Sequence, residues 1–254
     1  MSIVLSATGI VKSFGAKTVL KDMSVTAHRG DVIALIGASG SGKSTFLRCL
    51  NFLETPDSGE LDFGGDQIDI TTFRKLSVRE RNRRVNAIRR NIGMVFQGFN
   101  LWSSKTLLEN VIEAPVHVHG RPRRECIEQA EGLLASVGLA SFRDYYPKQL
   151  SCGQQQRGAI ARALAINPSV LLFDEPTSAL DPELVNEVLQ VMQRLADAGS
   201  TMIVVTHEMA FARNVSNKVI FCENGSISAS GTPNEIFSKE GPAALRKFMT
   251  TVSH

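Results

Sequence analysis

The stretch Val32-Ile-Ala-Leu-Ile-Gly-Ala-Ser-Gly-Ser-Gly-Lys-Ser44 is the most informative part of the sequence. Residues 32–36 are apolar throughout, which is typical of a strand that is buried on both faces of a parallel sheet. The pattern Gly-x-x-x-x-Gly-Lys-Ser follows at residues 37–44, and a helical pattern runs from Thr45 to Leu53. A strand, a glycine-rich loop and a helix in this order predict a phosphate-binding loop.

The residues of this loop have separate tasks in phosphate binding. Glycines let backbone N–H groups turn inward around phosphate oxygens, and the helix N-terminus adds a partial positive charge. Lys43 is expected to reach the β- and γ-phosphates of a nucleotide, and the Ser44 hydroxyl is expected to hold Mg²⁺. A glycine-rich turn without a ligand is the alternative, and the strand–loop–helix context disfavours it. The predicted nucleotide-binding residues here are Gly37, Ala38, Ser39, Gly40, Ser41, Gly42, Lys43, Ser44 and Thr45.

Two further apolar runs end in polar residues. Residues 170–173 lead into Asp174 and Glu175, and residues 202–205 lead toward His207. Because α/β sheets bind ligands at the carboxyl ends of their strands, Asp174 is predicted to bind Mg²⁺, Glu175 to polarise the attacking water and His207 to contact phosphate. A solvated turn and a structural histidine are the alternatives.

The remaining segments predict one domain, residues 1–254, with three parts. Short strands at residues 3–5, 17–20, 24–27 and 59–63 favour a small antiparallel sheet, and residues 104–165 have helical periodicity. The expected division is an antiparallel subdomain at 1–30 and 58–70, an α/β core at 31–57 and 166–254, and a helical subdomain at 104–165.

Composition limits the class of protein. The 254 residues are 43% apolar and 21% charged, with a net charge of +3, which excludes disordered and disulfide-scaffold chains. Four cysteines without a Cys-x-x-Cys pair suggest free thiols in a reducing cytosol. The apolar runs are far below the roughly 20 residues that cross a bilayer, and no signal peptide is expected.

One charge run stands out between Arg74 and Arg90, with eight basic residues and one acidic residue. It suits either an anionic partner or a solvated helix face. Because no aromatic residues are interleaved for base stacking, the solvated face is preferred and no nucleic-acid partner is expected.

In combination, the motifs resemble the ATPases of ATP-binding-cassette (ABC) transporters over nearly the whole chain. The matching residues are 37–45, Gln97, Leu150-Ser-Cys-Gly-Gln154, 170–175, Ser178-Ala-Leu-Asp181 and His207. Residues 96–102 and 108–115 resemble the ATPase subunits of polar amino-acid importers, above all those that handle histidine, arginine, lysine, ornithine and opines. The resemblance implies a P-loop α/β fold with a mixed core sheet, an antiparallel β subdomain and a helical insert.

The resemblance also implies roles for residues that spacing alone does not assign. Phe14 would stack on adenine, and Gln97 would touch the Mg²⁺ region and sense membrane subunits. Asp181 would lie at a protomer interface. Ser151, Gly153 and Gln154 would face the γ-phosphate held by the opposite protomer.

The implied function is ATP hydrolysis that drives amino-acid import. Two ATP molecules would lie between the protomers of a head-to-tail homodimer, which would bind two separate transmembrane permease subunits at the cytoplasmic face of the inner membrane. A solute-binding protein on the other side would deliver the amino acid. A non-transport cytosolic ATPase and an exporter subunit are the alternatives, and the chain itself holds no residues that name the amino acid.

Two residues depart from the family pattern. Cys152 replaces the glycine expected third in Leu-Ser-Gly-Gly-Gln, and a side chain there predicts altered turnover and sensitivity to alkylation. Ser104 stands where close relatives often carry histidine.

Overall fold

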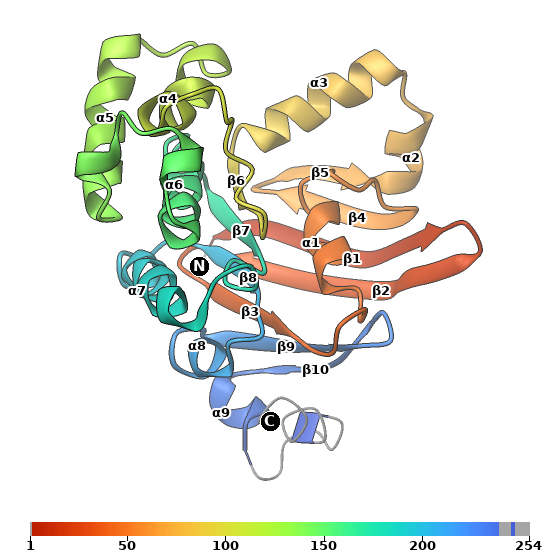
Figure 1. The fold of residues 1–254 in the computed structure, drawn as a ribbon. Coiled ribbons are helices and arrows are strands. Elements are labelled where there is room, and N and C mark those ends of the chain that lie inside the picture. The colour runs from red at the N-terminus through yellow and green to blue at the C-terminus, as the bar shows by residue number, and fades with distance from the viewer. Residues whose placement is uncertain (1, 239–244, 247–254) are drawn as a thin grey trace.

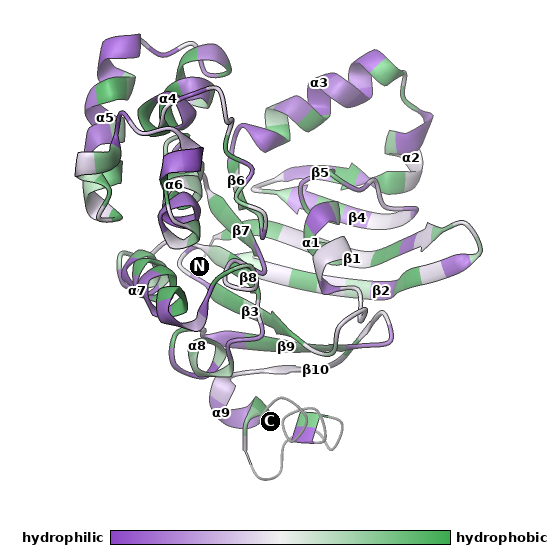
Figure 2. Cartoon of the chain, in the orientation of Figure 1, coloured by the Kyte–Doolittle hydropathy of each residue, from purple (hydrophilic) through white to green (hydrophobic). Residues whose placement is uncertain are grey.

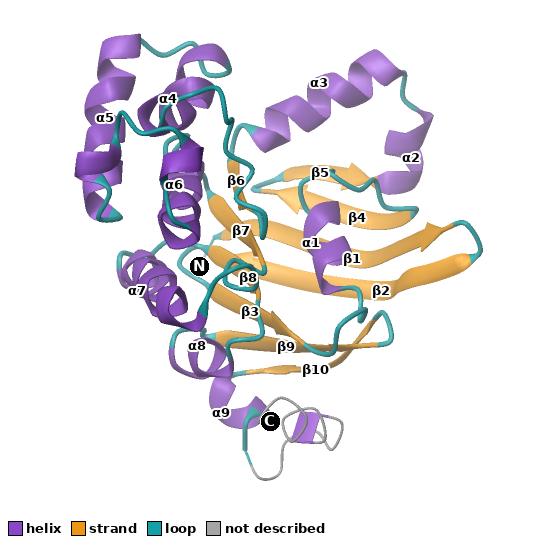
Figure 3. Cartoon of the chain, in the orientation of Figure 1, coloured by secondary structure: helices purple, strands orange, loops and turns teal. Residues whose placement is uncertain are grey.

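The computed structural model describes residues 2–238 and 245–246, so part of the expected core range 166–254 lies outside it. Two sheets dominate the described residues, and helix α1 (Lys43–Cys49) packs between them against strands of both. Helices α4, α5 and α6 gather on one side of the molecule, whereas α2 and α3 lie over the antiparallel sheet (Figures 1 and 3). The phosphate-loop segment therefore enters a helix held on two sides.

The first sheet is antiparallel and has the order β2-β1-β4-β5. Its strands are β1 (Ile3–Phe14), β2 (Lys17–His28), β4 (Ser58–Phe63) and β5 (Asp66–Asp69). The expected strands at 17–20 and 24–27 are one strand, which corrects the sequence-based division. The polar residues Lys21 and Asp22 interrupt the apolar pattern, so the sequence indicates two strands. In the structure Asp22 has φ 87°, and the pairing with β1 changes register beside it, so the strand continues through an irregularity.

The second sheet is mixed and has the order β10-β9-β3-β8-β7-β6. Its strands are β3 (Val32–Ile36), β6 (Ile92–Val95), β7 (Val170–Asp174), β8 (Met202–Val205), β9 (Lys218–Glu223) and β10 (Ser226–Gly231). All neighbouring pairs are parallel except β9 with β10. The predicted mixed α/β core is confirmed, and β6 joins it from outside the ranges assigned to the core.

The helices are short and mostly capped. Besides α1 they are α2 (Ile70–Lys75), α3 (Val78–Arg89), α4 (Leu107–His117), α5 (Arg123–Ser136), α6 (Cys152–Leu164), α7 (Pro182–Asp197), α8 (Met209–Asn214) and α9 (Pro233–Ile236), with 3₁₀ turns at Ala140–Phe142 and Pro147–Gln149. Helix α1 ends four residues before the expected Leu53. The Asn51 side chain accepts a hydrogen bond from the Leu53 N–H at 3.1 Å, and Phe52 adopts φ 57°, so the chain turns instead of continuing the helix.

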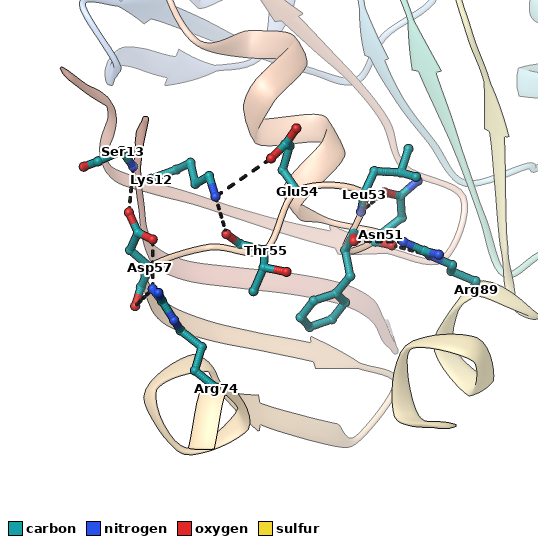
Figure 4. Close-up of polar contacts among 10 residues, drawn as sticks. Lys12, Ser13, Asn51, Leu53, Glu54, Thr55, Asp57, Arg74 and Arg89 are labelled. Atoms are coloured by element: carbon teal, nitrogen blue, oxygen red, sulfur yellow. Dashed lines mark hydrogen bonds and ion pairs between the residues drawn. The ribbon is translucent and has the colours of Figure 1, made fainter. Parts of the chain in front are cut away.

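The loop after α1 joins several elements. The Asp57 carboxylate accepts hydrogen bonds from the Ser13 N–H at 2.7 Å and from Arg74 at 2.8 Å, and Arg89 donates to the carbonyls of Asn51 and Phe52 (Figure 4). These contacts tie β1, α2 and α3 to the loop that follows α1.

Helix α3 carries most of the basic run and is largely hydrophilic (Figure 2). Arg84 pairs with Asp66 at 2.7 Å, and Arg74 on α2 pairs with Asp57 at 2.8 Å. These charges therefore lie mainly on a solvated surface, as the sequence favoured.

Candidate functional site

The glycine-rich loop follows β3 and enters α1. Gly37 has φ 144°, and a Cβ atom there would lie 2.1 Å from the Cys222 carbonyl oxygen. Gly42, the N-cap of α1, has φ 98°, and a Cβ atom there would lie 2.8 Å from the Leu20 side chain. Both positions require glycine for conformation and for space, so the loop is held tightly between β2 and β9.

Lys43 holds its ammonium group at the base of this loop. Its Nζ donates to the carbonyl oxygens of Gly37 and Ala38 at 2.9 Å each, and the side chain is buried. Burial lowers the pKa of Lys43, and the negative charges of Glu175 and Asp174 oppose that shift. The negative oxygens of a bound phosphate would also raise the pKa of Lys43, and they would pair with its ammonium group.

Asp174 ends β7 and is almost completely buried. Arg48 on α1 pairs with its Oδ2 through Nη2 at 2.9 Å and Nε at 3.1 Å. Ser44 and Arg48 are four residues apart on the same helix and therefore share a face. Sequence reasoning missed Arg48, although this spacing from Ser44 is a signal that it faces β7.

Glu175 and His207 meet at the ends of β7 and β8. His207 Nε2 lies 3.5 Å from Glu175 Oε1, and Glu175 Oε2 accepts a hydrogen bond from Ser178 at 3.0 Å. Glu175 has φ 49°, which breaks the strand geometry directly after Asp174. The two neighbouring carboxylates thus enter different surroundings: one pairs with Arg48 and the other faces His207.

A cavity of about 480 Å³ opens beside the loop. Of the residues predicted to bind nucleotide, Gly40, Gly42, Lys43, Ser44, Thr45 and Glu175 line it. Ala38 and Ser39 are exposed on the loop, and Ser41 is buried beneath it. The lining residues that sequence reasoning missed are Lys17, Thr18, Val19, Lys21, Asn224 and Gly225. Asn224-Gly225 is a hairpin signal in the sequence, but its place against β2 depends on tertiary packing, with the Lys21 N–H donating to the Gly225 carbonyl at 2.7 Å.

Two expected contact residues lie apart from that cavity's lining. Phe14 ends β1, is exposed, and has the Lys12 ammonium 5.0 Å from its ring centroid. Gln97 is exposed just after β6. The carbonyl of the preceding Phe96 accepts a hydrogen bond from Gln156 on α6 at 3.4 Å, which links this loop to α6.

The serine–glycine–glutamine group begins α6. The Ser151 hydroxyl accepts from the Gln154 N–H at 3.2 Å, and the Gln154 side chain accepts from the Ser151 N–H at 2.9 Å, which forms a capping box. Gly153 is buried against Leu184 of α7, and Asp181 is the exposed N-cap of α7. None of these residues lines the cavity beside the phosphate loop of the same chain.

The donors present suit Mg²⁺. Ser44 and Asp174 supply a hydroxyl and a carboxylate, and Mg²⁺ binds such oxygen ligands together with phosphates and water. In the part of the chain that the structure describes, no three His, Cys, Asp or Glu side chains cluster as a metal site. A cation here would therefore rely on nucleotide phosphates for further ligands.

Known proteins are similar in sequence along nearly the whole chain. The nopaline permease ATP-binding protein P of Agrobacterium fabrum is 51% identical, covering 98% of this chain and 97% of that protein. The arginine/ornithine transport ATP-binding protein of Pseudomonas aeruginosa is 51% identical over 97% of each chain. The histidine/lysine/arginine/ornithine transport ATP-binding protein of Escherichia coli is 51% identical over 96% of each.

Solved structures agree with the fold. A dimeric bacterial ABC transporter cassette matches with a TM-score of 0.77 and 34% identity, covering 90% of this chain and 98% of that one. A cassette in a dimeric post-hydrolysis state, bound to ADP and Pi, matches with a TM-score of 0.76 and the same identity and coverage. The family described as "ABC transporter" matches residues 20–178. With this match and relatives at 51% identity, the chain belongs to the ABC transporter family.

Proposed function

We propose that this protein binds and hydrolyses MgATP to energise amino-acid import through separate permease subunits. The observation that carries the chemistry is the cavity that has Lys43 at its base and Glu175 at its edge, with His207 3.5 Å from that carboxylate. A phosphate-binding loop beside a carboxylate that can position water suits nucleotide hydrolysis, and the imidazole adds a polar group near the phosphates.

Each residue has a task in this reaction. Backbone N–H groups of residues 37–45 bind phosphate oxygens, and Lys43 neutralises charge on the β- and γ-phosphates. Bound Mg²⁺ would supply charge neutralisation at the phosphates, held by Ser44 and Asp174, with Gln97 near it. Glu175 orients and polarises the attacking water, and His207 holds the γ-phosphate. Phe14 would stack on adenine.

The proposed working unit is a head-to-tail homodimer. Ser151, Gly153, Gln154 and Asp181 would contact the nucleotide or the interface of the opposite protomer, which fits their position away from the cavity of their own chain. Two solved structures of one related cassette, MJ0796, are dimers. The N-terminus of α6 would direct its positive end at the partner's γ-phosphate.

The proposed place of work is the cytoplasmic face of the inner membrane. Among residues 2–238 and 245–246, no helix has both the length and the apolar composition needed to span a bilayer. The names of the relatives include permease and transport ATP-binding proteins, which supports separate membrane subunits and, beyond them, a solute-binding protein.

The proposed cargo is a basic amino acid or an opine. The relatives' names give nopaline, arginine with ornithine, and histidine with lysine, arginine and ornithine. The specificity itself resides in the partner proteins.

Replacement of Glu175 tests the chemistry. Glu175→Gln removes the carboxylate that polarises water, so ATP hydrolysis should fall by about 100-fold or more while ATP binding persists. Phosphate release and binding of a fluorescent ATP analogue measure the two effects. The matched control is Glu183→Gln, an exposed change in the first turn of α7. Full hydrolysis by Glu175→Gln would contradict the proposed role.

Uptake tests the transport assignment. In the native host, Glu175→Gln should abolish uptake of one or more of labelled arginine, lysine, histidine, ornithine or an opine, with the variant still expressed. Unchanged uptake of the whole panel would overturn the proposed cargo. The proposed ATPase chemistry would still be judged by the hydrolysis assay of Glu175→Gln.

A further inference from the structure

A second cavity, of about 470 Å³, lies where α3 and α4 end, beside the segment that leads from α6 to β7. It shares no lining residue with the cavity beside the phosphate loop. Its lining consists of Asn86, Arg89, Arg90, Ala114, His117, Val118, His119 and Ile166. Two arginines and two histidines thus line it, and no carboxylate does.

Several of these polar side chains have no partner. Among the described residues, the side chains of Asn86, Arg90 and His119 make no hydrogen bond or ion pair. Asn86 and Arg90 come from α3 and the residue after it, and His119 comes from the turn after α4. Two exposed polar side chains and one half-buried imidazole, from two segments, therefore converge on one hollow without a protein partner among the described residues.

Arg89 is fixed in place beside them. Its Nε donates to the Asn51 carbonyl at 2.9 Å and its Nη2 donates to the Phe52 carbonyl at 2.8 Å (Figure 4). These acceptors are neutral, so they orient the guanidinium without cancelling its charge, and Nη1 is left for another acceptor.

A carboxylate on α4 lies near the cavity and offsets part of its positive charge. Glu113, on α4, is ion-paired with Lys105, and its Oε2 is 3.9 Å from His117 Nε2. Burial lowers the pKa of His119, and the charges of Arg90 and Arg121 lower it further. Like charges held together in this way favour binding of an anion, which would relieve their repulsion.

We propose that this cavity binds the phosphate group of a phosphorylated small molecule or lipid headgroup. A phosphate presents several oxygens in different directions, which matches guanidinium and imidazole donors arriving from α3 and from the end of α4. A cavity of about 470 Å³ also leaves room for an organic portion attached to the phosphate. The site is independent of the nucleotide site and of the proposed transport function.

Titration of the histidines by NMR tests binding. The protein is first saturated with MgADP so that the phosphate loop is occupied, and glycerol 1-phosphate is then added. The His117 and His119 imidazole signals should shift saturably, and the pKa of His119 should rise because its protonated form gains an anionic partner.

Matched variants locate the site. Arg90→Gln removes a charge that has no protein partner, so the fold should persist and the affinity should fall about tenfold, as expected for loss of one charge-assisted hydrogen bond. Arg83→Gln removes the same charge from an exposed position of α3 outside the cavity and should leave the affinity unchanged. Equal affinity for Arg90→Gln and the wild type, or no histidine shift at all, would overturn the proposal.

Two comparisons define the ligand and its source. Acetate should bind far more weakly than glycerol 1-phosphate, and equal affinity would overturn the assignment to phosphate. Cosedimentation with phosphatidylglycerol vesicles but not with phosphatidylcholine vesicles, reduced by Arg90→Gln, would support a lipid headgroup. Binding of free glycerol 1-phosphate with no such cosedimentation would support a soluble ligand of the same chemistry.

Discussion

At the residue scale, the four cysteines illustrate how burial sets reactivity. Cys49, Cys126 and Cys222 are buried, whereas Cys152 is exposed at the first position of α6. Burial raises the pKa of both Cys49 and Cys222 to about 12. At pH 8 only about one part in ten thousand of such a thiol is ionised, and the thiolate is the reactive form.

Alkylation should therefore be selective for Cys152. Iodoacetamide at pH 8 should modify one thiol rapidly in the folded protein and all four in denaturant, as counted by mass spectrometry. Because Cys152 lies between Ser151 and Gly153, its modification should lower ATP turnover more than ATP binding. Cys152→Ser should remove the rapid modification, and persistence of that modification would show that another thiol is accessible.

At the element scale, helix α6 has a cap that combines stability with the proposed function. Ser151 caps α6 and Ser77 caps α3, and both are parts of capping boxes. Ser77 is the N-cap of α3, a helix that lies apart from α6 (Figure 1). The two serines thus have equivalent local roles in different surroundings.

Replacing these serines should separate stability from turnover. Ser151→Ala and Ser77→Ala should each lower the free energy of unfolding by about 1 kcal/mol, because each leaves a backbone N–H of the first turn without its partner. Only Ser151→Ala should also lower ATP turnover. Urea unfolding and phosphate release measure the two effects, and equal turnover in both variants would remove Ser151 from the proposed site.

The elements that were predictable from sequence are those with a strong local signal. Strands β3, β7 and β8 are continuous apolar runs, and such runs indicate buried parallel strands. The apolar spacing predicts a helix that continues to Leu53, but α1 ends earlier because the Asn51 side chain accepts a hydrogen bond from the Leu53 N–H. The unity of β2 was hidden by an irregularity that only its pairing with β1 explains.

At the scale of the whole molecule, part of the candidate site is predictable from local sequence and part depends on how distant segments pack together. The loop residues 37–45 are contiguous, so spacing alone indicates them. The residues that no local pattern indicates line the cavity because β2 and the β9–β10 hairpin pack against the loop; they are Lys17, Thr18, Val19, Lys21, Asn224 and Gly225. Arg48 belongs between these cases, since its helical spacing is visible in the sequence but its partner Asp174 is 126 positions away.

The proposed head-to-tail homodimer predicts a result that would not be obtained if each ATP site were formed by one chain alone. In such a dimer, each ATP would lie between Lys43 of one protomer and Ser151 of the other. Lys43→Ala and Ser151→Glu should each be inactive alone, the first through loss of the phosphate cation and the second through repulsion of the γ-phosphate. A mixed dimer of the two variants, however, contains one site with both residues intact.

Mixing the two inactive proteins in equal amounts should therefore restore ATP hydrolysis. Because half of the dimers are mixed and each has one intact site of two, about a quarter of wild-type turnover is expected if the sites act independently. Phosphate release by the mixture, compared with each variant alone, measures the recovery. A mixture of Lys43→Ala with Glu175→Gln is the control and should stay inactive. Lys43 and Glu175 line the same cavity of one chain. In a mixed dimer, therefore, one site lacks Lys43 and the other site lacks Glu175. No recovery in the first mixture, with mixed dimers demonstrated by differently tagged protomers, would mean that Ser151 serves the nucleotide of its own chain or none.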